Sequence, residues 1–126
     1  MDWTLEVVIL PVSDIDASVA FYRDQVGFDL DHDTRNEHMH VVQFTPRGSG
    51  CSIVFGDLPP QREMAPGSVR GLQLVVSDAQ AARKELVERG VECTEVDPQP
   101  WGHFVYFTDP DGNPWSVQAI PNRPNG

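Results

Sequence analysis

Apolar and polar residues change their spacing soon after the start of the chain. Segment Leu5–Val12 is rich in β-branched residues and alternates weakly, which predicts a strand. Ser13 or Asp14 then provides a cap for a helix, and Gly27 provides its C-terminal stop. Between them, apolar residues recur at helical spacing and predict one buried helix face, namely Ile15, Val19, Tyr22 and Val26.

The same order of elements is predicted twice. Three strands are expected after the first helix, near Phe28–Asp33, His40–Thr45 and Cys51–Phe55. The second half again predicts a strand, a helix that stops at Gly90, and three further strands. Their expected bounds are Val69–Val76, Asp78–Arg89, Val91–Val96, His103–Thr108 and Trp115–Ile120.

The sequence itself also repeats. The tripeptide VSD at 12–14 recurs at 76–78, and HVVQFT at 40–45 is answered by HFVYFT at 103–108. The offset stays at 63 or 64, so the chain contains two modules of about sixty residues. The joint at 57–68 carries three prolines and a glycine, which is typical of a linker. Each βαβββ module has an apolar face that it cannot bury alone, so the two either cover each other's core or share a cleft.

The strand before the second helix predicts which sheet face meets a ligand. The apolar set Leu72, Leu74 and Val76 is expected under the helix. The mixed set Gly71, Gln73 and Val75 then lines the opposite face, where a small molecule has room to bind. By the same parity, the residues expected on that face of the first module are Val7, Ile9 and Pro11.

Composition narrows the class of partner. The chain has 126 residues, with nine Lys and Arg against nineteen Asp and Glu, which gives a net charge of −10. This balance, without a basic cluster, argues against binding to nucleic acid or to an anionic membrane surface. The start MDWTLEVVIL lacks the basic region of a signal peptide, and a cytoplasmic location is expected. Cys51 and Cys93 are expected to be free thiols.

Two segments resemble a known family. VSDIDASVAFYRDQVGF at 12–28 and FTDPDGNPW at 107–115 resemble the vicinal oxygen chelate superfamily, which includes glyoxalase I, bleomycin-resistance proteins and extradiol dioxygenases. The resemblance implies an α+β fold in which two tandem βαβββ modules form a half-open, barrel-like cleft. Residues 1–126 are then one domain, with module 1 at 5–56, a linker at 57–68, module 2 at 69–120 and a flexible tail at 121–126.

The resemblance also indicates where a metal would be held. Metal-dependent members of the superfamily take ligands from the first and last strand of each module. The corresponding residues here are Val7, Ser52, Gly71 and Ser116. None carries an imidazole, thiolate or carboxylate, so the usual metal site is expected to be absent and no cofactor is expected.

Two other groups of residues contain side chains that can bind a metal ion. His38 and His40 are spaced to point the same way from one strand, with His32 and Glu37 near in sequence, but an exposed polar hairpin explains them as well. The alternating carboxylates at positions 29, 31 and 33 lack the glycine turn of a calcium loop. Charged groups on one face of an edge strand, which discourage edge pairing, are the favoured interpretation.

Candidate chemistry in the cleft rests on six side chains. His103 and Tyr106 are the candidates for acid–base catalysis, but their opposite parity prevents both from facing the cleft. Neutral hydrogen-bonding residues are better placed to orient a ligand, and these predicted ligand-binding residues are Ser52, Gln73, Ser116 and Gln118. Trp3 and Trp101 are considered as aromatic walls, whereas the parity of Trp115 predicts packing under the helix.

These observations favour a metal-free protein that binds a small organic molecule in its cleft, of the drug-sequestering, bleomycin-resistance type. The alternative is a lyase or isomerase related to glyoxalases and dioxygenases that uses acid–base residues or an atypical metal site. The sequence leaves open whether any reaction is catalysed. A C₂ homodimer is expected, because members of the superfamily commonly dimerise.

Overall fold

The structure, a computed structural model, describes residues 1–120 and confirms the α+β fold with two sheets. Its helices are α1 (Ile15–Ala20), the π-helical segment η1 (Phe21–Val26), α2 (Pro59–Arg62) and α3 (Ala79–Glu88). The strands of the first module are β1 (Val7–Ile9), β2 (Asp29–Arg35), β3 (His40–Thr45) and β4 (Ser52–Gly56). Those of the second are β5 (Leu72–Val76), β6 (Asp97–Gln99), β7 (Gly102–Thr108) and β8 (Pro114–Ala119).

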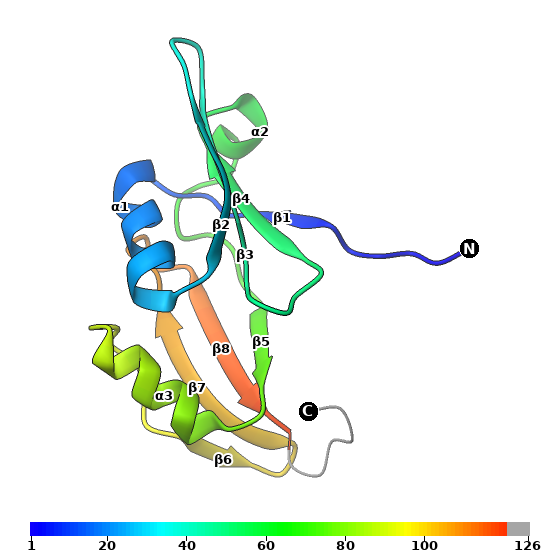
Figure 1. Cartoon of the computed structure of the whole chain (residues 1–126), viewed down its shortest axis with the longest axis vertical. Coiled ribbons are helices and arrows are strands. Elements are labelled where there is room, and N and C mark those ends of the chain that lie inside the picture. The colour runs from blue at the N-terminus through cyan, green and yellow to red at the C-terminus, as the bar shows by residue number, and fades with distance from the viewer. Residues whose placement is uncertain (121–126) are drawn as a thin grey trace.

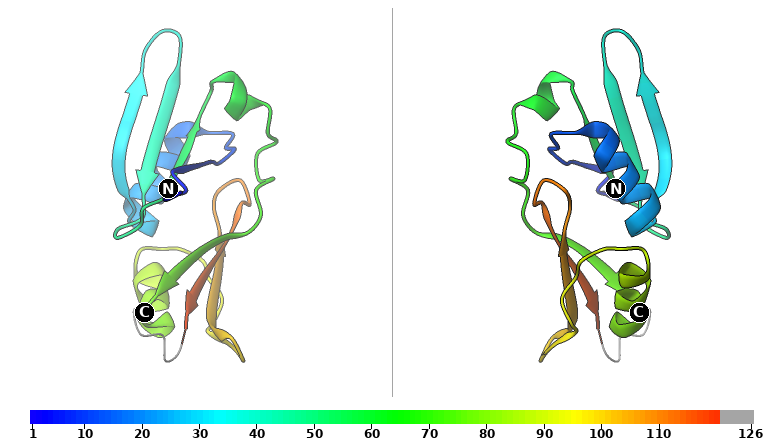
Figure 2. Two further views of the ribbon diagram at one scale, coloured as in Figure 1. Left: turned by 90° about the vertical axis from the view of Figure 1, so that its right-hand side faces the viewer. Right: turned by 90° about the vertical axis from the view of Figure 1, so that its left-hand side faces the viewer.

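Each module forms its own four-stranded sheet. The strand orders are β1-β4-β3-β2 and β5-β8-β7-β6, and the first strand of each module runs parallel to the last. The sheets occupy separate halves of the molecule, and neither closes into a barrel (Figures 1 and 2). Helices α1 and α3 lie on the same side of the two sheets, which leaves the opposite faces uncovered (Figure 1).

The first helix begins and ends at the predicted residues. The Asp14 carboxylate accepts a 3.0 Å hydrogen bond from the backbone N–H of Ala17, which caps α1. Gly27 ends the helical run in the left-handed region with φ 85°, a conformation that disfavours a side chain. Between these points the backbone widens into η1, which the spacing of apolar residues did not predict.

Module 2 follows the prediction except at one strand. Asp78 caps α3 by accepting from Ala81, and β5, β7 and β8 lie within one to three residues of their predicted bounds. The strand predicted at Val91–Val96 is wrong. There Val91 is buried in the core and Cys93 makes only an isolated bridge to Phe107. The edge strand β6 instead begins at Asp97, where the chain pairs with β7.

The two modules share one hydrophobic core. Tyr22 of module 1 stacks on Phe28 with ring centroids 5.8 Å apart, and it makes an edge-type contact with Trp115 of module 2 with centroids 5.9 Å apart. Trp115 is buried and stacks on Phe107, which confirms that it packs under the helices. Because aromatic residues from both halves interdigitate, each module covers part of the other's apolar surface.

The turn between β7 and β8 also joins the modules. The Ser13 hydroxyl and backbone N–H both donate to the carboxylate of Asp111. The side chain of Asn113 is fully buried and donates 2.9 Å to the carbonyl of Pro11. Inside the turn, the Asp109 carboxylate accepts from the backbone N–H groups of Asp111 and Asn113. The two segments that carry the family resemblance are therefore bonded to each other.

The connection between the modules is not entirely irregular. It contains the short helix α2, whose buried Gln61 side chain accepts 2.8 Å from the backbone N–H of Leu58. No described helix combines the length and hydrophobicity needed to cross a membrane. The tail predicted at 121–126 lies outside the described residues.

Candidate ligand-binding face

The polar residues expected in the cleft of module 2 share one sheet face. Ser116 on β8 lies opposite Gln73 on β5 and opposite Tyr106 on β7, and directly paired residues project to the same side. The Gln73 amide donates to the side-chain oxygen of Gln118, whose own amide donates 3.0 Å to the carbonyl of Trp101. The structure therefore brings Gln73, Ser116 and Gln118 together on the side away from α3.

A cavity of about 460 Å³ lies at this face. Its lining includes Gly71, Thr94, Tyr106, Thr108 and Ser116, but neither Gln73 nor Gln118. The Ser116 hydroxyl has no hydrogen-bond partner among residues 1–120, so it is available to a ligand. The volume falls within the usual range for small-molecule sites, and the lining mixes apolar surface with a few polar groups.

Tyr106 has an aromatic and an acidic neighbour. Its ring stacks on Phe104 with centroids 5.9 Å apart and an interplanar angle of 4°. Its hydroxyl donates 3.3 Å to the carboxylate of Asp97, and partial desolvation followed by this carboxylate raises the pKa of Tyr106. The phenol is therefore protonated at neutral pH and acts there as a hydrogen-bond donor rather than as a base.

His103 projects to the other side of the same strand. It alternates with Val105 and Phe107, which are buried in the core, but its own side chain is exposed at the end of β7. It lines neither the cavity beside Ser116 nor two other cavities of residues 1–120, whose volumes are about 420 and 470 Å³. The structure thus separates the two candidate catalytic residues, as their parity predicted, and leaves Tyr106 at the cavity.

On the equivalent face of module 1, the polar side chains hydrogen-bond to one another. Ser52 pairs with Val7 across β1 and β4, and its hydroxyl lies 2.6 Å from that of Thr45. Thr45 donates its proton to the Asp31 carboxylate, so the Ser52 hydroxyl must be the donor to Thr45. Ser52 is buried and its proton is engaged, which distinguishes it from Ser116.

The register refines the positions that correspond to the superfamily's metal ligands. Val7 lies beside Ser52 as expected, but the residue beside Ser116 on β5 is Gln73 rather than Gly71. Within residues 1–120, His, Cys, Asp and Glu side chains form no group of three or more that would hold a metal ion. The donors at these positions are hydroxyl and amide groups, which are weak ligands for a divalent cation.

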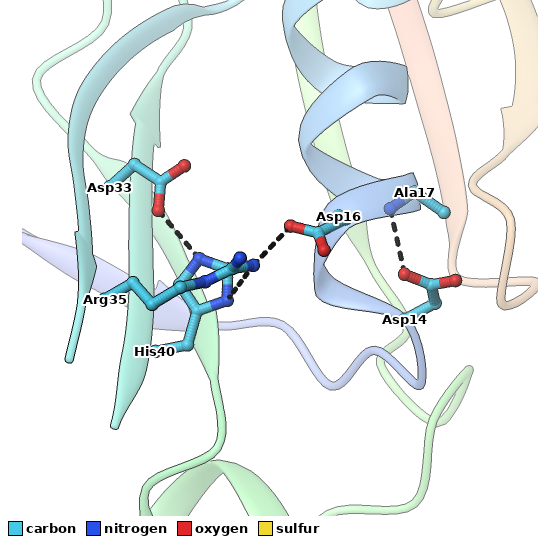
Figure 3. A network of polar contacts seen from close by, with 6 residues as sticks. All are labelled: Asp14, Asp16, Ala17, Asp33, Arg35 and His40. Carbon is cyan, nitrogen blue, oxygen red and sulfur yellow. Dashed lines mark hydrogen bonds and ion pairs between the residues drawn. The ribbon is translucent and has the colours of Figure 1, made fainter. Parts of the chain in front are cut away.

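His40 belongs to a polar network instead of a metal site with His38 (Figure 3). Its Nε2 lies 2.7 Å from the Asp33 carboxylate, and its Nδ1 lies 3.1 Å from an Arg35 nitrogen, which in turn lies 2.6 Å from Asp16. Because a guanidinium only donates, Nδ1 must be the acceptor and Nε2 carries the proton. The expectation that His38 and His40 point the same way is wrong, since His38 lies in the exposed turn before β3 and His40 is buried.

The three aspartates of β2 do not share one face either. The strand register shifts between Leu30 and His32, which marks a β-bulge. The Asp31 carboxylate accepts from the hydroxyl of Thr45, whereas the Asp33 carboxylate contacts the imidazole of His40 on the other face of the sheet. Asp29 has a long contact with Arg47, at 3.7 Å. The strand is an exposed edge strand, as expected, but each carboxylate has its own partner.

Several groups at the site were missed by sequence reasoning. Phe104 and Asp97 flank Tyr106, and Thr94 lines the cavity because the chain there runs beside β7 without forming a strand. The alternation of Phe104 with Tyr106 was a usable signal for the first of these. By contrast, Trp3 and Trp101 are 88% and 64% exposed and contribute no wall to this cavity within one chain.

Two open four-stranded sheets built from repeated βαβββ modules, with a small cavity on the uncovered face, define a class of fold shared by binding proteins and enzymes. Residues 4–117 match the model of the Glyoxalase/Bleomycin resistance protein/Dioxygenase superfamily. The chain belongs to this superfamily.

Solved structures provide further relatives. TnmS3, an antibiotic binding protein from Streptomyces sp. CB03234, is 37% identical over 94% of this chain and 97% of its own, with a TM-score of 0.83. A glyoxalase/bleomycin resistance protein from the same organism is 38% identical over 91% and 99%, with a TM-score of 0.77. A superfamily member from Sphaerobacter thermophilus is 29% identical over 94% and 98%, with a TM-score of 0.78. No curated protein matches the chain.

Proposed function

We propose that the protein binds a small organic molecule, of the kind that drug-sequestering proteins hold, in the cavity beside Ser116. The observation that carries this proposal is the cavity itself, where an available hydroxyl and a protonated phenol meet apolar surface. Such groups orient a ligand by hydrogen bonds. The similarity to an antibiotic binding protein at 37% identity supports the same class of ligand.

We further propose that the working unit is a homodimer. Trp3, Leu5 and Val7 alternate with polar residues along the extended N-terminal segment, which leaves the sheet and points away from the rest of the chain (Figure 1). These side chains are 88%, 70% and 39% exposed. An apolar stripe of this kind is stabilised when a second copy covers it.

Ligand binding is tested by titration with cationic glycopeptide antibiotics and with planar aromatic antibiotics, followed by calorimetry and by the melting temperature. Tyr106→Ala should weaken binding at least tenfold, because it removes a stacking surface and the phenol oxygen from the cavity. His103→Ala is the matched control, since it alters the opposite side of the same strand. Absence of any heat or thermal shift with both ligand classes would contradict the proposal, as would equal effects of the two substitutions.

The dimer is tested separately by sedimentation equilibrium. The expected mass is twice the 14.0 kDa of the chain at micromolar concentration. The double variant Trp3→Ser and Leu5→Ser should shift the population toward monomer, whereas Val87→Ser, which removes an exposed apolar residue from α3, should not. A monomeric wild-type protein would refute this part of the proposal and leave ligand binding to be judged on its own data.

A further inference from the structure

A second cavity lies between the two modules, apart from the face that carries Ser116. Its volume is about 420 Å³, and only Phe107 borders both cavities. Module 1 contributes the end of η1, the two residues before β2 and the turn after β3, while module 2 contributes mainly β5 and α3. The cavity therefore exists only because the two modules are held together.

The walls of this intermodule cavity are mainly apolar. Phe28, Leu86 and Val117 are buried members of the shared core that reach its surface. Leu74 and Val76 of β5 are only half-buried, because the helix-side face of this edge strand is incompletely covered. Exposed apolar surface inside a concavity favours a ligand with a hydrophobic body.

Two arginines from opposite modules border the same cavity. Arg89 closes the C-terminal end of α3, and one of its guanidinium nitrogens donates 3.3 Å to the carbonyl of Val26. That guanidinium packs over Gly27, where a Cβ would lie 2.8 Å from Nη1, so a glycine permits this approach. Arg47 faces Asp29 only at 3.7 Å and is 87% exposed.

The acidic groups nearby leave these donors available. Glu85 is the one carboxylate in the lining, and it forms no ion pair with Arg89 within residues 1–120. In a chain with a net charge of −10, most surface repels an anion. This cavity is a place where two guanidinium groups and an apolar wall meet, and a guanidinium binds a carboxylate through paired, charge-assisted hydrogen bonds.

We propose that the intermodule cavity is a second binding site, which takes a small organic carboxylate with an apolar ring or short chain. The hydrophobic body lies against Phe28, Leu74 and Leu86, and the carboxylate accepts hydrogen bonds from Arg89 with Arg47 alongside. A ligand held in this way contacts both modules, so it stabilises their arrangement as well as the fold. The site is independent of the function proposed for the cavity beside Ser116.

The test uses 2-naphthoate and its uncharged analogue 2-naphthamide, followed by calorimetry and by the melting temperature. Naphthoate should bind about tenfold more tightly than the amide, and Arg89→Gln should weaken naphthoate about tenfold without changing the amide. Lys84→Gln is the matched control, because it removes a positive charge from the same helix outside the cavity. Equal affinity for acid and amide, or an equal loss in both variants, would overturn the proposal.

Two further variants locate the bound naphthoate. Ala82→Met fills the cavity from α3 and should abolish naphthoate binding in a protein that still unfolds cooperatively. Ser116→Leu alters the other cavity and should leave naphthoate affinity unchanged. If Ser116→Leu alone reduced binding, the naphthoate site would be the other cavity and the proposal would fail. Affinity that falls as protein concentration rises would show that a second copy covers the intermodule cavity, which also overturns it.

Discussion

The hydroxyl of Tyr22 donates a 2.8 Å hydrogen bond to the carboxylate of Asp109, a residue 87 positions later in the chain. The same oxygen accepts a 3.0 Å bond from the indole nitrogen of Trp115. All three residues are buried, so each polar atom depends on the others in place of water. One phenol thus satisfies two buried groups of the opposite module.

Removal of this hydroxyl should destabilise the fold. Tyr22→Phe keeps the ring in its stack with Phe28 but leaves the Trp115 N–H and one Asp109 oxygen with fewer partners. We expect a loss of about 1–3 kcal/mol in the free energy of unfolding, measured by urea denaturation. Tyr106→Phe is the control, because that hydroxyl is exposed, and it should change stability by less than about 0.5 kcal/mol. Similar losses in the two variants would show that burial of the Tyr22 network is unimportant.

Tyr22 should also make stability depend on alkaline pH. Burial, and then the Asp109 carboxylate, raise the pKa of Tyr22 far above its ordinary value of 10.0. The unfolded chain releases this proton near pH 10 and the folded chain retains it, so the stabilisation is complete below pH 10 and declines above it. The expected slope is up to about 1.4 kcal/mol per pH unit. Urea denaturation between pH 8 and 11 should show a steeper decline for the wild type than for Tyr22→Phe, and parallel declines would contradict this assignment.

Substitution of two glycines with similar backbone conformation should distinguish the cost of backbone strain from the cost of a steric clash. Gly48 and Gly67 have nearly equal φ angles of 83° and 80°, but a Cβ at Gly48 would meet nothing within 4 Å. A Cβ at Gly67 would lie 2.3 Å from the backbone oxygen of Asp111. We expect Gly48→Ala to destabilise by roughly 1–2 kcal/mol and Gly67→Ala by several kcal/mol more, because the turn that joins the modules must move. Equal melting temperatures for the two variants would show that this close approach is relaxed in solution.

The buried imidazole of His40 depends on one carboxylate. Asp33→Ala removes the acceptor of its Nε2 proton and leaves a buried donor without a partner, which should destabilise by about 1–3 kcal/mol. Asp29→Ala on the same strand breaks only the exposed 3.7 Å contact with Arg47, and a change below about 1 kcal/mol is expected. Chemical denaturation of both variants measures the two losses in the free energy of unfolding. A larger loss for Asp29→Ala than for Asp33→Ala would contradict the stabilising role of the His40–Asp33 hydrogen bond.

Features set by neighbouring residues were predictable from the sequence. Asp14 and Asp78 cap their helices and Gly27 ends the first one, because capping depends on side chains and backbone within a few positions. The repeat predicted two modules, each of which forms its own sheet, and strand parity predicted that His103 and Tyr106 lie on opposite faces. These conclusions need only the period of a strand and the order of elements.

Features set by distant contacts were not predictable in this way. The repeat predicted a strand at 91–96, but Val91 packs into the core and only Cys93 bridges to Phe107, so regular pairing with β7 begins at Asp97. The bulge at Asp31 changes which face each aspartate meets, and alternation alone assumes that no residue is inserted. The intermodule cavity joins residues near Phe28 to residues near Arg89, so it required the arrangement of both modules.

The bond between Ser13 and Asp111 spans 98 positions, and it closes only when the chain's two halves have met. Contacts so far apart in sequence must overcome a large loss of chain entropy before they stabilise anything, which slows folding. Because the aromatic core is completed by the same encounter, neither half has a finished interior of its own. The chain should therefore fold and unfold in a single kinetic step, in spite of its duplicated architecture.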